Sequence, residues 1–390
     1  MRIRTLLLGL GAIVYSGLFG ELFLRALKPQ PLVPRYVTGG ADGVRANMPD
    51  VAFRQWTPEV DVTVRYNAAG MRDDRPPPPL AKPPGECRIA LLGDSYFVGF
   101  ESAWPTSFAA RLEAELAAAG VKARVLNFAV SGFGTAENLV VMQRRVPQWR
   151  PDVVVMSWHA TDPADNLRSG LFRLNGDRLQ PTGQPFLPGI ELSDRLMAWP
   201  GYRWLIENSH LYSAVRERAG QIIKGLLVAV RGAEAGADSG PEGFVVVPPA
   251  PSLPSLAPPR GAGQGDARLD RALITAVEGA AAQAGARLLL FDIPTRRSRT
   301  DFLSPIALML GEAPVPAVSP QSAFSAVARP DLKLYWEQGH LHWTPQGNAI
   351  AARVAARDIL SRGWLAACMG PGAGRSASGH EAIEAGAISP

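Results

Sequence analysis

The chain has 390 residues, 47% of them hydrophobic, which is enough for one large α/β domain with insertions or for two smaller domains. Lys and Arg total 40 against 35 Asp and Glu, a formal net charge of +5, and no basic run is interleaved with aromatic residues, so nucleic acid is not an expected partner. Neither of the two cysteines belongs to a C-x-x-C pair, which excludes a zinc ribbon and a thioredoxin motif.

Residues 1–28 predict a membrane anchor. Two arginines lie within the first four residues, and residues 5–20 carry no charge. As a helix, residues 6–27 would span roughly the 30 Å hydrocarbon core of a bilayer. The basic start favours an N-terminus that stays inside. No small-x-small cleavage site follows, so an uncleaved signal anchor is favoured over a removed signal peptide and over a buried core helix. Both membrane interpretations put the rest of the chain outside the cytoplasm, in the periplasm or at the cell surface.

Residues 29–85 are expected to form a stalk and an N-terminal extension. A Pro-rich stretch at 28–34 follows the anchor. Within 51–66, Val60, Val62, Val64 and Tyr66 alternate with polar residues, which is typical of a strand. NAAGMR at 67–72 predicts a turn, and the proline runs of 75–85 predict a linker.

From residue 86 to residue 365, apolar strands alternate with helices, which indicates a parallel sheet covered by helices on both faces. The sequence therefore predicts a three-layer α/β/α domain of the flavodoxin-like type. Its expected strands are 88–92, 123–128, 152–158 and 287–293, and its expected helices are 105–119, 135–146, 269–283 and 344–361.

The alternation fails between 166 and 267, which we interpret as an insertion. It holds a helix-like piece at 212–231 and a Gly/Ala/Pro/Ser-rich stretch at 232–267, which is expected to be disordered, as is the tail at 366–390. Outside the cytosol, Cys87 and Cys368 could form a disulfide that ties the first core strand to the end of the last helix. Two free thiols are the alternative.

The sequence RIALLGDSYFV at 88–98 carries the strongest chemical signal. A buried strand ends at Leu92, and Gly93, Asp94 and Ser95 follow at once. In an open parallel sheet, ligands bind just beyond the carboxyl ends of the strands. A serine on a tight glycine turn at that edge is well placed as a nucleophile, provided that a base lies within hydrogen-bond reach.

This motif and three later segments resemble the sequence blocks of the SGNH, or GDSL, hydrolase superfamily, in particular its membrane-anchored bacterial members. NFAVSGFGT at 127–135 matches the second block, with Gly132 as the oxyanion-hole glycine. HATD at 159–162 matches the third, with Asp162 retained and Thr161 where the family has asparagine. HLHWTPQG at 340–347 matches the last, with His342 as the catalytic histidine and His340 where anchored relatives have aspartate.

The resemblance implies Ser95 as nucleophile and His342 as its base. The backbone N–H groups of Ser95 and Gly132, with the Thr161 hydroxyl, would form the oxyanion hole. Because the family's aspartate is missing, a backbone carbonyl or Glu337 could orient His342 and leave a dyad, or another carboxylate could take the place of the aspartate.

Further residues are expected to line the site or to orient the histidine, and helix capping is the simpler role for the first of them: Asp94, Asp162, Glu337 and His340. The spacing of His159 and His340 is not that of a metal site, so neither a metal nor another cofactor is expected.

The resemblance implies a serine esterase that cleaves O-acetyl or other acyl esters of a cell-envelope glycan through an acyl-enzyme. Polysaccharide O-acetyl transfer is an alternative, because it shares that intermediate. A catalytically weak or inactive SGNH-fold glycan-binding protein is another, favoured by Thr161 and His340. The expected partners are an ester or glycan substrate and the membrane, and the sequence identifies no protein partner.

Overall fold

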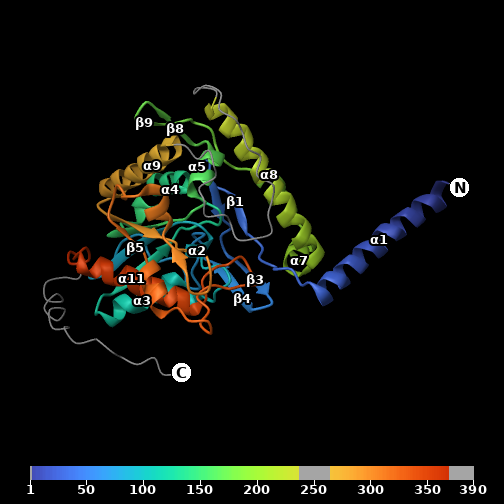
Figure 1. The fold of residues 1–390 in the computed structure, drawn as a ribbon, viewed down its shortest axis with the longest axis horizontal. Coiled ribbons are helices and arrows are strands. Elements are labelled where there is room, and N and C mark those ends of the chain that lie inside the picture. The colour runs from blue at the N-terminus through green and yellow to red at the C-terminus, as the bar shows by residue number, and fades with distance from the viewer. Residues whose placement is uncertain (1, 237–263, 369–390) are drawn as a thin grey trace.

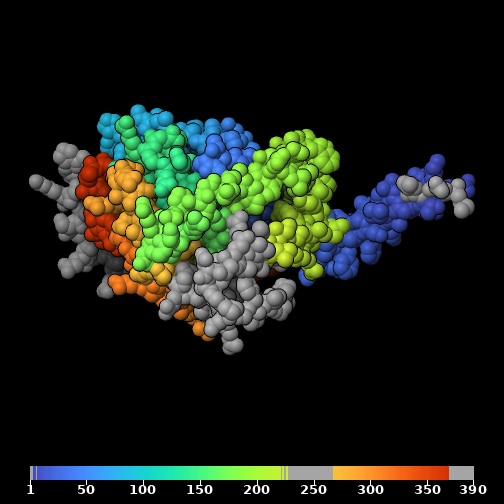
Figure 2. Space-filling view, turned by 90° about the horizontal axis from the view of Figure 1, so that it is seen from above, coloured from blue at the N-terminus to red at the C-terminus, as the bar shows by residue number. Residues whose placement is uncertain are grey.

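The structure is a computed structural model that describes residues 2–236 and 264–368. The first helix, α1 (Arg2–Leu27), projects from the rest of the molecule (Figures 1 and 2). Its segment Ile3–Leu27 is long and apolar enough to cross a membrane, as a membrane anchor or a signal sequence would be. The predicted disorder at 232–267 and 366–390 falls largely on residues outside the described ranges.

The centre of the fold is a five-stranded sheet in the order β13-β10-β7-β5-β6, and every neighbouring pair is parallel. In chain order this is 2-1-3-4-5, the flavodoxin-like arrangement. The prediction of a parallel flavodoxin-like sheet is therefore confirmed. The strands are β5 (Cys87–Leu92), β6 (Ala123–Asn127), β7 (Val153–Trp158), β10 (Arg287–Asp292) and β13 (Ala317–Val318).

Alternate residues of each central strand enter two separate cores. In β5, Ile89 and Leu91 pack into one core, and Ala90 and Leu92 pack into the other. This follows from the two-residue repeat of a strand that is buried on both faces. Helices α3 (Phe108–Ala118) and α11 (Pro345–Ser361) cover one face, and α4 (Thr135–Arg144) and α9 (Gln264–Gln283) cover the other (Figure 1).

Residues 29–85 are more than a stalk. They form two antiparallel hairpins, β1 (Val37–Gly39) with β2 (Arg45–Asn47) and β3 (Val51–Thr57) with β4 (Val60–Tyr66). Phe53, Val64 and Tyr66 of the second hairpin are buried in the same core as α3 and α11. Val33 in the expected stalk is buried there too. The Pro-rich stretch therefore packs against the domain instead of separating the domain from α1.

The predicted insertion builds one side of the molecule. After α5 (Asp162–Ser169) come the hairpin β8 (Phe172–Asn175) and β9 (Arg178–Pro181), then α6 (Ile190–Met197), α7 (Pro200–Asn208) and α8 (His210–Gly236). The helix-like piece expected at 212–231 lies within α8, which packs beside α5 (Figure 1). The remaining short elements are α2 (Ser95–Val98), η1 (Trp104–Thr106), η2 (Pro147–Trp149), β11 (Thr295–Arg296), β12 (Phe302–Leu303), η3 (Ile306–Leu310) and α10 (Gln321–Val327).

The side chain of Glu21 in α1 caps the N-terminus of α8. Its carboxylate accepts hydrogen bonds from the backbone N–H groups of His210 and Leu211, at 3.0 and 2.9 Å, and from the Ser209 hydroxyl at 2.8 Å. The first N–H groups of a helix have no partner within the helix, so an acceptor supplied from outside satisfies them. The apolar helix and the domain therefore meet at a defined contact.

Cys87 and Cys368 form a disulfide. The bond joins the first residue of β5 to the segment that follows α11, as the sequence allowed. Asp152 lies close enough to the two sulfurs for the three groups to resemble a metal site, but the disulfide already engages both sulfurs.

Candidate active site

Ser95 lies directly beyond the carboxyl end of β5, as the first residue of α2. The chain passes so close to β7 here that a Cβ on Gly93 would come within 2.1 Å of the Ser157 hydroxyl oxygen. Glycine is therefore required at this position. Asp94 caps α2 by accepting a hydrogen bond from the Tyr96 backbone N–H at 3.0 Å, which is the structural role expected for it. Ser95 itself stays partly exposed.

His342 lies just before α11, in a tight loop whose two sides pair at Tyr335 and Trp343. The Trp336 backbone N–H donates to the His342 carbonyl at 2.9 Å, which holds the loop closed. The imidazole is buried, and its Nε2 is 2.8 Å from the Ser95 hydroxyl oxygen. The two residues proposed as nucleophile and base are therefore within hydrogen-bonding distance although 247 positions separate them.

The second imidazole nitrogen of His342 faces a carboxylate that the sequence analysis did not identify. His342 Nδ1 is 2.6 Å from Oε2 of Glu101, whose side chain is fully buried. The arrangement is therefore Ser95–His342–Glu101: the dyad is wrong, and another carboxylate takes the place of the family's aspartate. Glu101 comes only six residues after Ser95 and far before His342 in the chain. The family pattern places the acid beside the histidine, so that pattern could not identify Glu101.

Three hydrogen bonds, besides the contact with His342, fix Glu101 in place. Its backbone N–H donates to the buried Gln55 side chain at 2.8 Å, and its carbonyl accepts from the Trp336 indole at 3.1 Å. The His340 backbone N–H donates to Oε1 at 3.0 Å. A Cβ on Gly339 would come within 1.7 Å of that oxygen, so only glycine admits the carboxylate here. Glu101 also has a positive φ of 59°, a conformation that only such contacts sustain in a residue with a side chain.

Glu337, the substitute carboxylate suggested by the sequence, does not orient His342. It is engaged by Arg299, at 2.7 and 2.8 Å, and by Arg296 at 3.4 Å. These guanidinium groups hold the pKa of Glu337 below its usual value, mainly through the hydrogen bonds from Arg299. Because these arginines hold the Glu337 carboxylate, it does not contact the imidazole of His342.

The other two candidates have supporting positions. Asp162 is buried and accepts from the Thr135 hydroxyl at 3.0 Å and from the His159 backbone N–H at 2.8 Å, so it ties the loop after β7 to α4. His340 does not replace the missing aspartate as an acceptor for His342. Its backbone holds Glu101, and its ring Nε2 is 3.8 Å from Glu217 of α8.

Gly132 follows β6 with a left-handed φ of 74°. The carbonyl of Ser131 accepts from Arg45 at 3.2 Å, and the carbonyl of Gly132 accepts from Arg45 at 2.9 Å and from Arg168 at 3.0 Å. The N–H and C=O of a trans peptide point in opposite directions. The Gly132 N–H therefore points away from Arg45, and within the described residues it donates no hydrogen bond.

Thr161 is exposed at the N-terminus of α5, and its hydroxyl oxygen is 3.1 Å from Nδ1 of His159. The His159 ring contacts that of Tyr96, which in turn contacts that of His342. Burial, and secondarily the neighbouring His342, lowers the pKa of His159 to about 4. His159 is therefore a neutral ring near pH 7 that lines the candidate site, and lining the site was one of the two positions that the sequence suggests for it.

The electrostatics of the Glu101 carboxylate suit a charged acceptor. Burial raises its pKa, but the hydrogen bond and charge of His342 and the contacts with His340 outweigh burial, so the pKa lies below its usual value. A carboxylate that stays ionised in the interior can stabilise an imidazolium that forms beside it.

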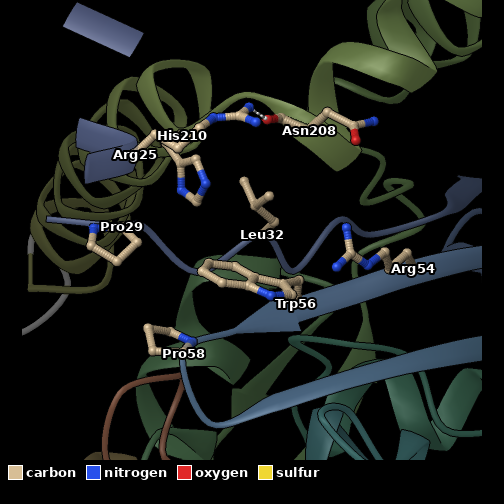
Figure 3. Close-up of a pocket in the computed structure, with 8 residues that line it drawn as sticks. All are labelled: Arg25, Pro29, Leu32, Arg54, Trp56, Pro58, Asn208 and His210. Carbon is tan, nitrogen blue, oxygen red and sulfur yellow. Dashed lines mark hydrogen bonds between the residues drawn. The ribbon is translucent and has the colours of Figure 1, made fainter. Parts of the chain in front are cut away.

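A cavity of about 500 Å³ lies elsewhere, where α1 meets the domain (Figure 3). Its two arginines are already paired, Arg25 with Glu21 and Arg54 with Asp61. None of the residues predicted for the active site lines it. The lining residues are Arg25, Pro29, Leu32, Arg54, Trp56, Pro58, Asn208 and His210.

One feature of the sequence marks Glu101 as a candidate for a functional residue. It is the only charged residue between Asp94 and Arg111, in a stretch that otherwise reads as buried or neutral. An acid is almost never buried without a partner. Gln55, Arg45 and Arg168 carry no comparable signal, because their contacts depend on how distant segments pack.

No family model and no curated protein sequence matches the chain. Among solved structures, it is similar to the lipase/acylhydrolase from Enterococcus faecalis, with 15% identity, a TM-score of 0.35 and coverage of 71% of this chain and 96% of that chain. It is similar to TesA, with 12% identity, a TM-score of 0.33 and coverage of 70% and 97%. A two-domain esterase active on acetylated mannans gives 12% identity, a TM-score of 0.35 and coverage of 71% and 49%.

Other similar structures carry the names SGNH hydrolase and GDSL-like lipase, the superfamily that the sequence resembles. At these identities and TM-scores the likeness gives no basis for an activity or a substrate. The functional assignment therefore rests on the geometry of the site.

Proposed function

We propose that the chain is a serine esterase in which Ser95, His342 and Glu101 act as nucleophile, base and orienting acid. The supporting observation is the unbroken series of contacts Ser95 Oγ–His342 Nε2–Glu101 Oε2, at 2.8 and 2.6 Å, beyond the carboxyl end of β5. A partly exposed serine, a base within reach and a buried ionised acceptor are the parts that nucleophilic acyl transfer needs.

In this mechanism the Ser95 oxygen attacks the ester carbonyl while His342 takes its proton. Glu101 fixes the proton on Nδ1 and stabilises the imidazolium. The backbone N–H groups of Ser95 and Gly132 receive the oxyanion, with Thr161 at its rim. His342 then protonates the departing alcohol, which leaves an acyl-Ser95. Water, activated by His342, attacks that acyl group and releases the acid and free Ser95.

The proposed substrate is an O-acetyl or other short acyl ester of a cell-envelope glycan. Transfer to a glycan hydroxyl would use the same acyl-enzyme and differ only in the acceptor. The inactive glycan-binding alternative was favoured by Thr161 and by His340 in place of the family's acid. Glu101 supplies an acid for His342 and so answers the second reason, whereas Thr161 still stands where the family has asparagine.

We further propose that the domain lies outside the cytoplasm and is anchored by α1. The apolar span of 25 residues supports an anchor, and the Cys87–Cys368 disulfide is typical of an oxidising compartment. A reporter fused after Pro390 should then be active only outside the cytoplasm. Activity inside the cytoplasm would contradict this localisation.

The esterase proposal is tested with the full chain in detergent micelles. We expect turnover of a chromogenic acetyl ester and labelling of Ser95 by a fluorophosphonate, both abolished in Ser95→Ala. Turnover no higher in the unmodified chain than in Ser95→Ala, with no labelling of Ser95, would show that the site is not catalytic.

A further inference from the structure

Exposed apolar side chains are concentrated in the insertion. Outside α1, nine large apolar side chains are exposed among the residues that the structure describes, and seven of them lie within residues 192–226. Three belong to α6 and α7 or adjoin them, and four belong to α8: Leu192, Trp199 and Trp204, then Val215, Ile222, Ile223 and Leu226. Soluble domains carry such side chains singly, so their concentration here indicates an interaction surface.

On α8 these side chains form one stripe. Val215, Ile222 and Leu226 recur at spacings of seven and four positions, which places them on one face of a helix. The stripe begins at Leu211, four positions before Val215, whose side chain lies against α1: a Cβ on Gly20 would be 3.5 Å from it. Beyond this contact with α1 the stripe is exposed.

The opposite face of α8 packs against the domain. Ser213 is buried and donates to the Pro31 carbonyl at 2.6 Å, and Glu217 lies 3.8 Å from the His340 ring. Ser213 and Glu217 are each two positions from Val215, which is about 200° around a helix of 3.6 residues per turn. One face of α8 therefore binds the domain through polar contacts, and the other presents an apolar stripe.

The surface lies on the side of the domain from which α1 projects, because α7 and α8 lie between α1 and the central sheet (Figures 1 and 2). Arg25 near the end of α1 donates to the carbonyl of Asn208, the last residue of α7, at 2.7 Å. From this junction α8 runs in a different direction from α1 (Figure 1). With α1 across a bilayer, the adjoining bilayer surface would therefore lie against α7 and α8.

The chemistry of this surface fits a lipid surface. Tryptophan is enriched where a protein meets the interface of membrane and water, because its ring is apolar and its N–H is polar. Arg203 and Arg218 are exposed in the same segment, and the exposed Lys28 follows α1, whereas the exposed Glu191 is already paired with Arg195. Apolar and aromatic side chains beside basic ones are typical of helices that lie on anionic membranes.

We propose that α7 and the apolar stripe of α8 lie in the interfacial region of the bilayer that α1 crosses. Trp199 and Trp204 would lie at the depth of the lipid headgroups, with Arg203 and Arg218 against anionic headgroups. Only α8, about 10–12 Å across, would then separate the bilayer from His340 and the loop that carries His342. This inference goes beyond the proposed esterase activity and rests only on the proposed anchor.

The test measures the depth of single spin labels on the full chain in vesicles of phosphatidylethanolamine and phosphatidylglycerol. Both native cysteines form the disulfide, so an introduced cysteine is the only free thiol. Trp204→Cys and Ile222→Cys probe the surface, and Leu18→Cys probes α1. Ala114→Cys is the control, because Ala114 is exposed on α3, which lies on the far side of the domain from α1 (Figure 1).

We expect the labels at 204 and 222 to lie roughly 5–10 Å into the boundary between headgroups and acyl chains. Their ratio of collisions with oxygen to collisions with a water-soluble nickel complex should be several-fold higher than that of the label at 114. Thermal unfolding of each labelled chain, compared with that of the unmodified chain, checks that the fold is retained.

The contact of the two arginines with anionic headgroups has its own measurement. Replacing phosphatidylglycerol by neutral phosphatidylcholine should make the label at 222 shallower, and Arg203→Gln with Arg218→Gln should remove that difference. Arg357→Gln, a change of an exposed arginine of α11, is the matched control and should preserve the difference. Equal depth in both kinds of vesicle in the unmodified background would overturn this contact.

Three outcomes would overturn the proposal, and each has a different meaning. Labels at 204 and 222 as accessible to nickel as the label at 114, with the label at 18 in lipid, would leave the anchor intact and remove the surface. A label at 18 in water would overturn the anchor and this inference with it. Spin–spin broadening at 222 without lipid contact would make a second copy of the chain the occupant. Ester turnover enters none of these measurements, so failure of the esterase proposal remains distinguishable.

Discussion

Glu101 combines three properties that rarely occur together: complete burial, a positive φ without being glycine, and a carboxylate that stays ionised between His342 and His340. Each costs free energy by itself, because a left-handed conformation crowds the Cβ and a buried carboxylate loses its hydration. Leu341, next to the histidine, is another described non-glycine residue with a positive φ, at 61°. Strain therefore lies on both sides of the His342–Glu101 contact, as is common at functional sites.

Replacing Glu101 by Gln should lower kcat by about 10²- to 10⁴-fold, because an amide neither fixes the histidine tautomer reliably nor stabilises the imidazolium. The measurement is turnover of a chromogenic acetyl ester by the full chain in detergent. Glu337→Gln is the matched control, because it makes the same chemical change in a carboxylate that binds Arg299 and not His342. It should leave kcat unchanged. A large loss in Glu337→Gln and none in Glu101→Gln would reverse the assignment of the acid.

The buried carboxyl group of Asp94 makes the stability of the folded chain depend on pH. Burial, with a smaller contribution from Asp165, raises its pKa from 3.8 to about 7. Between these values the folded chain retains a proton that the unfolded chain has lost, so stability falls as the pH rises through this window. Asp94→Asn keeps the acceptor for the Tyr96 N–H and removes the titration.

We therefore expect the stability of Asp94→Asn relative to the unmodified chain to increase with pH across that window, by at most about 1.4 kcal/mol per pH unit. Denaturant unfolding of both chains at several pH values measures this difference. A difference that stays constant from acid to neutral pH would show that Asp94 does not titrate there.

At the scale of elements, the hairpin β3–β4 supports the site from outside the sheet. Its Gln55 accepts the Glu101 N–H, and Glu59 at its turn accepts from the backbone N–H groups of Glu337 and Gln338, at 2.5 and 2.6 Å. The same hairpin thus supports the turn that carries the acid and the loop that leads to His342. A segment expected to be only an extension therefore supports the residues of the proposed active site.

Gln55→Leu should destabilise the chain by about 1–3 kcal/mol, the cost of leaving the buried Glu101 N–H without an acceptor. It should also lower kcat, because Glu101 would no longer be held toward His342. Unfolding and ester turnover are measured on the same preparation. Gln148→Leu, the same substitution at an exposed residue of η2, should change neither. Full activity in Gln55→Leu would show that the hairpin does not position the acid.

Four of the five strands of the central sheet were predicted from the sequence, each to within a residue of its observed bounds; the fifth, β13, has only two residues and no apolar run to mark it. That success follows from strong local patterns: short, continuously apolar strands, and helices with caps such as Thr344, whose hydroxyl accepts the Gly347 N–H. Ser95 and His342 were also found, since each lies at an element boundary with a recognisable motif. Glu101, Gln55 and Arg45 were missed because their roles arise only when loops from different parts of the chain meet.

At the scale of the whole molecule, the Cys87–Cys368 disulfide closes nearly the entire domain into one loop, with a sequence separation of 281 residues. It joins the strand that leads to Ser95 to the segment after the helix that follows His342. Removing it in the double variant Cys87→Ser, Cys368→Ser should lower the unfolding free energy by about 2–4 kcal/mol. The active site is formed by other contacts, so kcat at low temperature should be retained.

The measurement is the midpoint of thermal unfolding of the unmodified chain and of the double variant, each with and without reductant. Reductant should lower the midpoint of the unmodified chain to that of the double variant and leave the double variant unaffected. Equal midpoints for the two chains under oxidising conditions would show that the bond contributes nothing to stability.

The cap that Glu21 provides to α8 has a practical consequence for handling this protein. The Gln30 N–H also donates to the His210 ring at 2.9 Å. The segment that follows α1 is therefore bound to the domain and is not a free linker. Cutting the chain at residue 28 to obtain a soluble enzyme would expose three donors at the start of α8 and should cost about 0.5–2 kcal/mol. With α1 in a bilayer, these contacts would hold the domain at a fixed distance from the membrane and in a fixed orientation. The proposed active site could then reach only acylated chains that come to that position.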